Sequence, residues 1–103
     1  MTNKKKPKIA GFISKLRAAI EAARYLDTYH SSLRLGERMI TRREMLFVLK
    51  NSYHERNKDR FNEHYGQWNY AVRGLTVDGR ELRVIVSNID KQWVIITAID
   101  LGA

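Results

Sequence analysis

The sequence predicts an α+β domain in which N-terminal helices pack on one face of an antiparallel meander sheet of three to four strands. Two observations predict this class. Apolar residues recur at three- and four-residue steps in the first half of the chain, whereas the second half alternates apolar and polar residues between turn signals. A chain of 103 residues is long enough for one domain with one modest hydrophobic core.

The first predicted helix covers residues 9–27, where an apolar stripe follows the helical period. Residues 1–8 precede it and contain four lysines around Pro7. Like charges repel, and Pro7 cannot continue a helix, so we expect a disordered basic tail over residues 1–8 and a single domain over residues 9–103. The stripe consists of Ile9, Phe12, Ile13, Leu16, Ile20, Ala23 and Leu26.

Two further helices are expected before the sheet. One runs from about Tyr29 to Arg38, with Asp27 or Thr28 as its N-cap. The segment Thr41-Arg42-Arg43-Glu44 is a capping-box pattern, in which the Thr41 hydroxyl and the Glu44 carboxylate each accept a hydrogen bond from the other residue's amide. It predicts a third helix that ends near Asn51.

The remaining residues are expected to form strands. Asp78-Gly79 and Asp90-Lys91 are typical of two-residue hairpin turns. Residues 58–66 are predicted to be a loop because they are rich in charged residues, Asn and Gly. The expected strands are a short edge strand over Tyr53–Asn57, and then Gln67–Val77, Arg80–Ile89 and Gln92–Ile99.

The two turns predict a register, and the register assigns side chains to the two faces of the sheet. Leu75 is expected opposite Leu82, Arg73 opposite Val84, Val84 opposite Thr97, and Val86 opposite Ile95. The face predicted to pack on the helices carries Leu75, Leu82, Val84, Val86, Trp93, Ile95 and Ile99. The other face carries Trp68, Tyr70, Val72, Arg83, Ile85, Val94 and Ile96, and we expect a helix, a partner chain or RNA to cover it.

Positive charge is concentrated in the N-terminal half. Residues 1–27 hold seven basic and two acidic side chains, residues 28–56 hold six and three, and residues 57–103 hold six and six. This asymmetry favours a phosphate-rich partner or an acidic protein. The chain has no cysteine, which excludes disulfides, thiolate zinc sites and a Cys nucleophile. No apolar run approaches the length of a membrane span, so we expect no membrane partner and a cytoplasmic location.

His30, Arg34 and Arg38 follow one another at four-residue steps, so they share one side of the second predicted helix. An imidazole can take a proton from a ribose 2′-hydroxyl, and guanidinium groups can stabilise the charge that develops on the phosphate. The spacing therefore predicts a catalytic group of His30, Arg34 and Arg38. The alternative is a helix-terminal histidine with two ordinary surface arginines.

Other residues are candidates for contact with RNA. Trp68 and Tyr70 could stack on unpaired bases, with Arg83 on the same face, and Arg73 and His54 could join them. The alternative is that these aromatic residues belong to the core. The spacing of His and carboxylate residues indicates no metal site, and we find no motif that indicates a cofactor.

The segment from His30 to Ile99 resembles a small bacterial domain family of unknown function. The matching pattern is His30, Arg34, Arg38 and Ile40, followed by a helix over residues 41–50 and by the strand segments 78–86 and 94–97. Where the family usually has Gly before that Ile, this chain has Met39. The family is similar to the RelE/BrnT group of ribonuclease toxins. The resemblance implies a RelE-like fold, RNA cleavage without a metal, neutralisation by a cognate antitoxin, and a role for His30, Arg34 and Arg38.

Two functions are therefore expected. The first is a toxin-like, metal-independent endoribonuclease of a bacterial toxin–antitoxin pair, which cleaves RNA by attack of the 2′-hydroxyl. The second is a non-catalytic basic module that binds nucleic acid or an acidic partner protein. A homodimer that forms through the second apolar sheet face is a further expectation.

Overall fold

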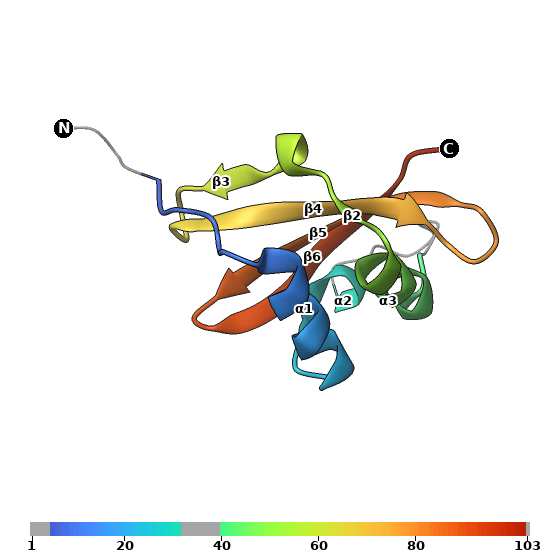
Figure 1. Ribbon diagram of the computed structural model, residues 1–103, viewed down its shortest axis with the longest axis horizontal. Helices are drawn as coiled ribbons and strands as arrows, with labels where there is room; N and C mark the ends of the chain where they lie inside the picture. Colours follow the sequence, from blue (N-terminus) through green and yellow to red (C-terminus); the bar gives the residue numbers. More distant parts are fainter. Residues whose placement is uncertain (1–4, 32–39, 103) are drawn as a thin grey trace.

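The computed structural model describes residues 5–31 and 40–102. In these residues, three helices lie on one side of a mixed, mostly antiparallel open sheet (Figure 1). The helices are α1 (Phe12–Glu21), α2 (Thr28–Ser31) and α3 (Arg42–Asn51). The strands are β1 (Leu26–Asp27), β2 (Tyr53–His54), β3 (Arg60–Asn62), β4 (Gln67–Leu75), β5 (Glu81–Ile89) and β6 (Gln92–Asp100).

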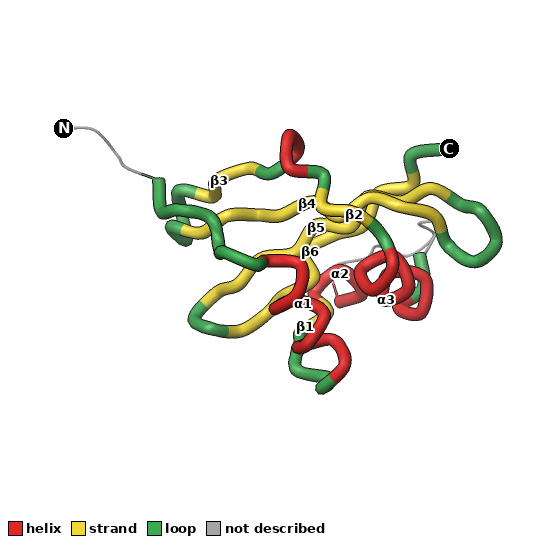
Figure 2. Tube along the Cα trace, viewed as in Figure 1, coloured by secondary structure: helices red, strands yellow, loops and turns green. Residues whose placement is uncertain are grey.

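The sheet order is β1-β6-β5-β4-β2, and β3 also pairs with β4. The short 3-10 helix η1 (Arg56–Lys58) joins β2 to β3 and lies apart from the other helices (Figure 2). The predicted α+β class is confirmed. The predicted strand number is wrong, because the described residues form six strands rather than three or four.

Helix α1 is shorter than predicted at both ends. Its last turn closes with hydrogen bonds from the Ala23 amide to the Ile20 carbonyl and from the Arg24 amide to the Ala19 carbonyl. This pattern is a Schellman motif, and it places Ala23 in the left-handed region at a φ of 56°. The helix therefore ends six residues before its predicted end at residue 27, and Leu26 enters strand β1 instead.

Helix α3 confirms the predicted capping box. The Glu44 amide donates to the Thr41 hydroxyl at 3.1 Å, and the Thr41 amide donates to the Glu44 carboxylate at 2.9 Å. At the other end, the Arg17 guanidinium of α1 donates to the carbonyls of Leu49 and Ser52. A cation at the C-terminal end of a helix is favourable because the last carbonyls lack partners within the helix.

Two short strands were not predicted. Strand β1 pairs in parallel with β6, with Leu26 opposite Val94, and strand β3 forms inside the predicted loop 58–66. Strands of two or three residues carry too little alternation for a sequence pattern to reveal them.

The predicted register of the β4–β5 hairpin is wrong by one residue. Arg73 lies opposite Arg83, and Gly74 lies opposite Leu82. The loop between β4 and β5 has three unpaired residues, 77–79, rather than two. The Gly79 amide donates to the Thr76 carbonyl, and within this loop Gly79 is the residue with a positive φ, 83°. A shift of one residue moves a strand's side chains to the opposite face.

The β5–β6 turn confirms the prediction. Asp90 and Lys91 have φ values of 51° and 64°, as a two-residue turn requires, and Val86 lies opposite Ile95. An irregularity between Ile85 and Val86 then places Ala98, not Thr97, opposite Val84.

The register decides which side chains form the core. Trp68, Tyr70 and Val72 lie on the helix-covered face, so the predicted grouping of Trp68 and Tyr70 with Arg83 is wrong. Leu75 and Ile99, predicted to be in the core, are exposed. The core contains Phe12, Leu16 and Ile20 of α1, Met45, Val48 and Leu49 of α3, and Tyr70, Val72, Leu82, Val84, Val86, Trp93 and Ile95 of the sheet.

Candidate functional site

The predicted catalytic group lies at the edge of what the structure describes. The backbone of His30 belongs to α2, whereas Arg34 and Arg38 lie outside the described residues. Helix α2 is anchored to the sheet, because the Thr28 hydroxyl donates to the Ile95 carbonyl at 2.8 Å. The hydroxyl of the buried Tyr29 accepts from the Ile40 amide, just before α3. The arrangement of the three catalytic side chains stays a prediction.

Two of the predicted RNA-contacting arginines are paired within the fold. Arg83 donates to the buried Glu55 carboxylate at 2.7 and 3.2 Å, and Arg73 donates to Glu55 at 3.0 Å and to Glu81 at 3.1 Å. The hydrogen bond from Arg83 is the main cause of the lowered pKa of Glu55, against the opposing effect of burial. Both arginines lie on the face of the sheet opposite α1 and α3, called the open face below, and carboxylates on this face compensate their positive charges.

The two predicted stacking residues have different surroundings. Tyr70 is 2% exposed, and its ring stacks on Phe12 with centroids 4.1 Å apart, which leaves no room for a base. Its hydroxyl accepts a hydrogen bond from the Ile9 amide, and burial raises its pKa. The indole of Trp68 donates to the Lys6 carbonyl, and the Lys8 ammonium lies 4.7 Å from the ring centroid.

His54, the remaining predicted RNA contact, pairs with the carboxylate of Asp59. His54 Nε2 lies 2.8 Å from Asp59 Oδ2, and the Asp59 side chain has no solvent exposure. The same oxygen lies 2.9 Å from the Lys8 ammonium, and Asp59 Oδ1 accepts from the Ala71 amide at 2.9 Å. Three donors therefore fix a buried carboxylate, which in turn fixes the imidazole.

The imidazole borders a cavity of about 340 Å³ beside the N-terminal end of α1. Its ring packs 4.7 Å from that of Phe12 and 5.9 Å from that of Tyr70. Two cations line the same cavity, Lys8 from the N-terminal segment and Arg56 from η1. The cavity therefore combines an oriented histidine with positive charge, and it is lined by Lys8, residues 9–13, His54 and Arg56.

This arrangement suits proton transfer next to a phosphate. A carboxylate only accepts hydrogen bonds, so Nε2 of His54 carries the proton in its bond to Asp59. In a neutral imidazole the lone pair is then on Nδ1, which can act as a base. The sequence pointed to His54 as a residue that could contact RNA or take part in catalysis, and it did not single out Asp59, because their pairing depends on how β2, η1 and β3 fold around β4.

Residues 5–31 and 40–102 contain no candidate metal site and no candidate membrane-spanning helix. There, no group of three or more His, Asp or Glu side chains could hold a metal ion. No helix of the described part has both the length and the apolar character needed to cross a bilayer.

Comparison with known proteins identifies the family. Residues 28–100 match the model of a domain of unknown function, DUF4258. The chain belongs to the DUF4258 family. No curated protein and no solved structure matches the chain. These findings confirm the resemblance to a family of unknown function and give no link to the RelE/BrnT toxins.

The DUF4258 match covers only part of the His54 cavity. It includes His54, Arg56 and Asp59, as well as the predicted group that begins at His30. Lys8 and Phe12 precede it: Lys8 lies in the N-terminal segment that passes the start of β4, and Phe12 begins α1 (Figure 1). In this chain the DUF4258 domain therefore shares its cavity with residues that the family model does not cover.

Proposed function

We propose that this chain is a toxin-like endoribonuclease that cleaves RNA without a metal, as one half of a bacterial toxin–antitoxin pair. The observation that carries the proposal is the His54–Asp59 pair at a cavity lined by Lys8 and Arg56. RNA contains its own nucleophile, the 2′-hydroxyl, so cleavage needs only proton transfer and stabilisation of the phosphate charge. The cavity brings together groups of both kinds.

In the proposed reaction, each side chain of the site has a separate role. His54 Nδ1 takes the proton of the 2′-hydroxyl as the 2′-oxygen forms a bond to phosphorus. The bond between phosphorus and the 5′-oxygen then breaks, and a protonated side chain supplies a proton to that oxygen. We propose His30, which the sequence predicts as a general base or acid, for this step. Arg56 stabilises the charge on the phosphate oxygens, and Lys8, whose ammonium is paired with Asp59, contributes positive charge beside it. The products are a 2′,3′-cyclic phosphate and a 5′-hydroxyl.

The distribution of charge supports RNA as the substrate. The formal net charge is +8, and the excess lies in the N-terminal half. Arg73 and Arg83 of the sheet and Arg80 of the β4–β5 loop are paired with carboxylates, and Lys8 is paired with Asp59, whereas Arg56 of the cavity has no carboxylate within ion-pairing distance among the described residues. We keep Arg34 and Arg38 as predicted phosphate contacts.

The proposed protein partner is a cognate antitoxin. The open face of the sheet exposes Tyr53, Leu75 and Ile99 beside its paired arginines, and such a mixed surface suits a protein partner. A second copy of this chain is the alternative occupant. Light scattering of the purified chain, alone and after co-expression with the product of the neighbouring gene, separates these two partners.

The test of cleavage uses the full chain, single-stranded RNA and EDTA. We expect discrete fragments that end in 2′,3′-cyclic phosphates. His54→Gln retains an amide donor for Asp59 but has no nitrogen that can accept a proton, so it is expected to lose cleavage by about 100-fold or more while it stays folded. His30→Ala tests the proposed acid in the same assay.

A matched pair of variants tests the role of the cavity cations. Arg56 and Lys58 both belong to η1 and are exposed, but only Arg56 lines the cavity. Arg56→Ala is expected to slow cleavage, and Lys58→Ala is not. Full activity in His54→Gln contradicts the assignment of His54. RNA that stays intact but shifts in mobility favours the non-catalytic binding module.

A further inference from the structure

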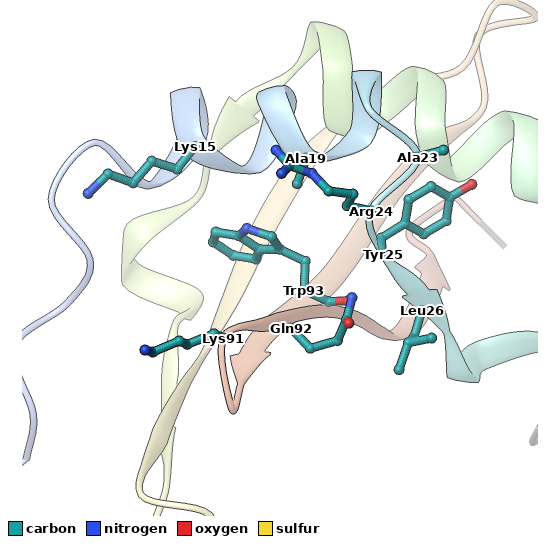
Figure 3. Close-up of a pocket in the computed structure, with 9 residues that line it drawn as sticks. All are labelled: Lys15, Ala19, Ala23, Arg24, Tyr25, Leu26, Lys91, Gln92 and Trp93. Atoms are coloured by element: carbon teal, nitrogen blue, oxygen red, sulfur yellow. The ribbon is translucent and has the colours of Figure 1, made fainter.

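A second pocket lies on the other side of α1, between that helix, the segment that follows it and the β5–β6 turn. Its volume is about 490 Å³, within the range of small-molecule sites. It is separate from the His54 cavity, because Phe12 packs between them, with its ring 4.7 Å from His54 and 5.8 Å from Trp93. Its lining residues are Lys15, Ala19, Ala23, Arg24, Tyr25, Leu26, Lys91, Gln92 and Trp93 (Figure 3).

Three cations surround this pocket. Figure 3 shows Lys15 from α1 and Lys91 from the β5–β6 turn extending past the indole of Trp93 on opposite sides, while Arg24 reaches back towards Ala19. In the part of the chain that the structure describes, no carboxylate lies within ion-pairing distance of any of the three. Their positive charges are therefore available to a ligand, unlike those of the sheet arginines.

The backbone places Arg24 and Lys91 at two walls of the pocket. The left-handed Ala23 turns the chain back at the end of α1, so that Arg24 lies over the pocket. The two-residue turn at Asp90-Lys91 holds Lys91 at the opposite wall, and the pairing of Leu26 with Val94 joins the two walls. The pocket is thus built from a helix end, a tight turn and a parallel strand pair, which is a preorganised arrangement.

Its chemistry matches a phosphorylated ligand with an aromatic part. A guanidinium and two ammonium groups recognise phosphate oxygens, and Arg binds them through two parallel hydrogen bonds. Trp93 offers aromatic surface to a nucleobase. We propose that this pocket binds a nucleoside monophosphate, either as a free nucleotide or as the 5′-phosphorylated end of an RNA strand.

The experiment monitors Trp93. Trp68→Phe leaves Trp93 as the one tryptophan of the chain, so its fluorescence reports on this pocket. Adenosine 5′-monophosphate is expected to change the emission in a saturable way, and adenosine without the phosphate is expected to have a much weaker effect. Calorimetric titration of the wild-type chain gives the same comparison if Trp68→Phe does not fold.

Variants localise the binding. Arg24→Ala and Lys91→Ala are each expected to weaken binding about tenfold or more, since each removes a charge-assisted contact. Lys58→Ala removes an exposed lysine that does not line the pocket and is expected to bind as the wild type does. Equal affinity in Arg24→Ala, or equal losses in all three variants, overturns the proposal.

Two further measurements identify the source of the ligand and test nucleotide binding independently of RNA cleavage. A short RNA with a 5′-phosphate that binds more tightly than its 5′-hydroxyl counterpart indicates an RNA end, whereas binding of the mononucleotide alone indicates a free nucleotide. His54→Gln, altered in the other cavity, is expected to bind the nucleotide normally. Nucleotide binding by a chain that cleaves no RNA supports this pocket and contradicts the proposed endoribonuclease.

Discussion

Arg73 and Arg83 lie directly opposite each other on neighbouring strands, and both hydrogen-bond the carboxylate of Glu55. Like charges at directly opposed positions of a sheet repel. Glu55 is 6% exposed, so its carboxylate offsets this repulsion where solvent screens it weakly. The open face of the sheet therefore depends on one buried acidic side chain.

Replacement of Glu55 by Gln is expected to lower the free energy of unfolding by about 2–3 kcal/mol, because it leaves two opposed guanidinium groups beside a neutral amide. The partial exposure of both arginines keeps the loss below that of a fully buried pair. Urea unfolding at neutral pH measures the effect. Glu63→Gln, at an exposed position, is the control and should be nearly neutral. A stability of Glu55→Gln equal to that of the wild type contradicts the role of Glu55.

Acidification is expected to destabilise the protein. The pKa of Glu55 is lowered chiefly by the hydrogen bond from Arg83, and the pKa of Glu44 is lowered chiefly by the hydrogen bond from the Thr41 amide. A carboxyl whose folded-state pKa is depressed contributes stability above its unfolded-state pKa of about 4.3, and this stability is lost as the pH falls through the folded-state value.

Urea unfolding at a series of pH values between neutrality and pH ~3 measures this loss. The unfolding free energy of the wild type should fall most steeply below pH ~4.3, and that of Glu55→Gln should fall less over the same range, because the variant lacks one of the carboxylates. Parallel curves for the two proteins are the result that contradicts this assignment.

Gly74 is expected to tolerate no side chain. A Cβ at this position would overlap the side chain of Ser52, which follows α3. Gly74→Ala should therefore lower stability by about 1–3 kcal/mol. Ser52→Gly removes the obstacle, so a double-mutant cycle should show a favourable coupling between the two substitutions. Strictly additive effects would mean that the contact does not limit position 74.

Ala23→Gly is expected to stabilise the chain by about 0.5–1 kcal/mol. Ala23 has a φ of 56°, a conformation that is unfavourable for residues with a Cβ and accessible to glycine. Thermal unfolding measures the gain. The neighbouring Ala22 has a φ of −86°, so Ala22→Gly is the matched control and should stabilise nothing. A loss of stability in Ala23→Gly would show that the helix end does not limit stability.

The elements that the sequence predicted correctly are set by local interactions. The capping box at Thr41 lies within four residues, and the Asp90-Lys91 turn depends on two, so the chain itself specifies both. The prediction of the β4–β5 register was wrong for a local reason as well. Asp78-Gly79 is compatible with a two- or a three-residue loop, and the choice between them reverses the faces of the strand.

The candidate site was harder to predict because its partners meet only in the folded chain. Asp59 is held by Lys8 from 51 positions earlier and by the Ala71 amide of β4, and no spacing in the sequence indicates these contacts. The pairing of Glu55 with Arg83 depends on the same register that the sequence misassigned. Residue types predicted a basic chain with titratable groups, whereas the geometry selected His54 among them.

The segment ahead of the family match has a practical consequence for anyone who expresses this domain. Truncation at residue 28 would strip α1 from the sheet, uncover Tyr70 and Trp93, and deprive Asp59 of its lysine. Such a fragment would expose apolar residues of the core and a carboxylate without its lysine partner, and it would tend to aggregate. Recombinant versions of this protein should therefore retain residues 5–27, although the family match begins only at residue 28.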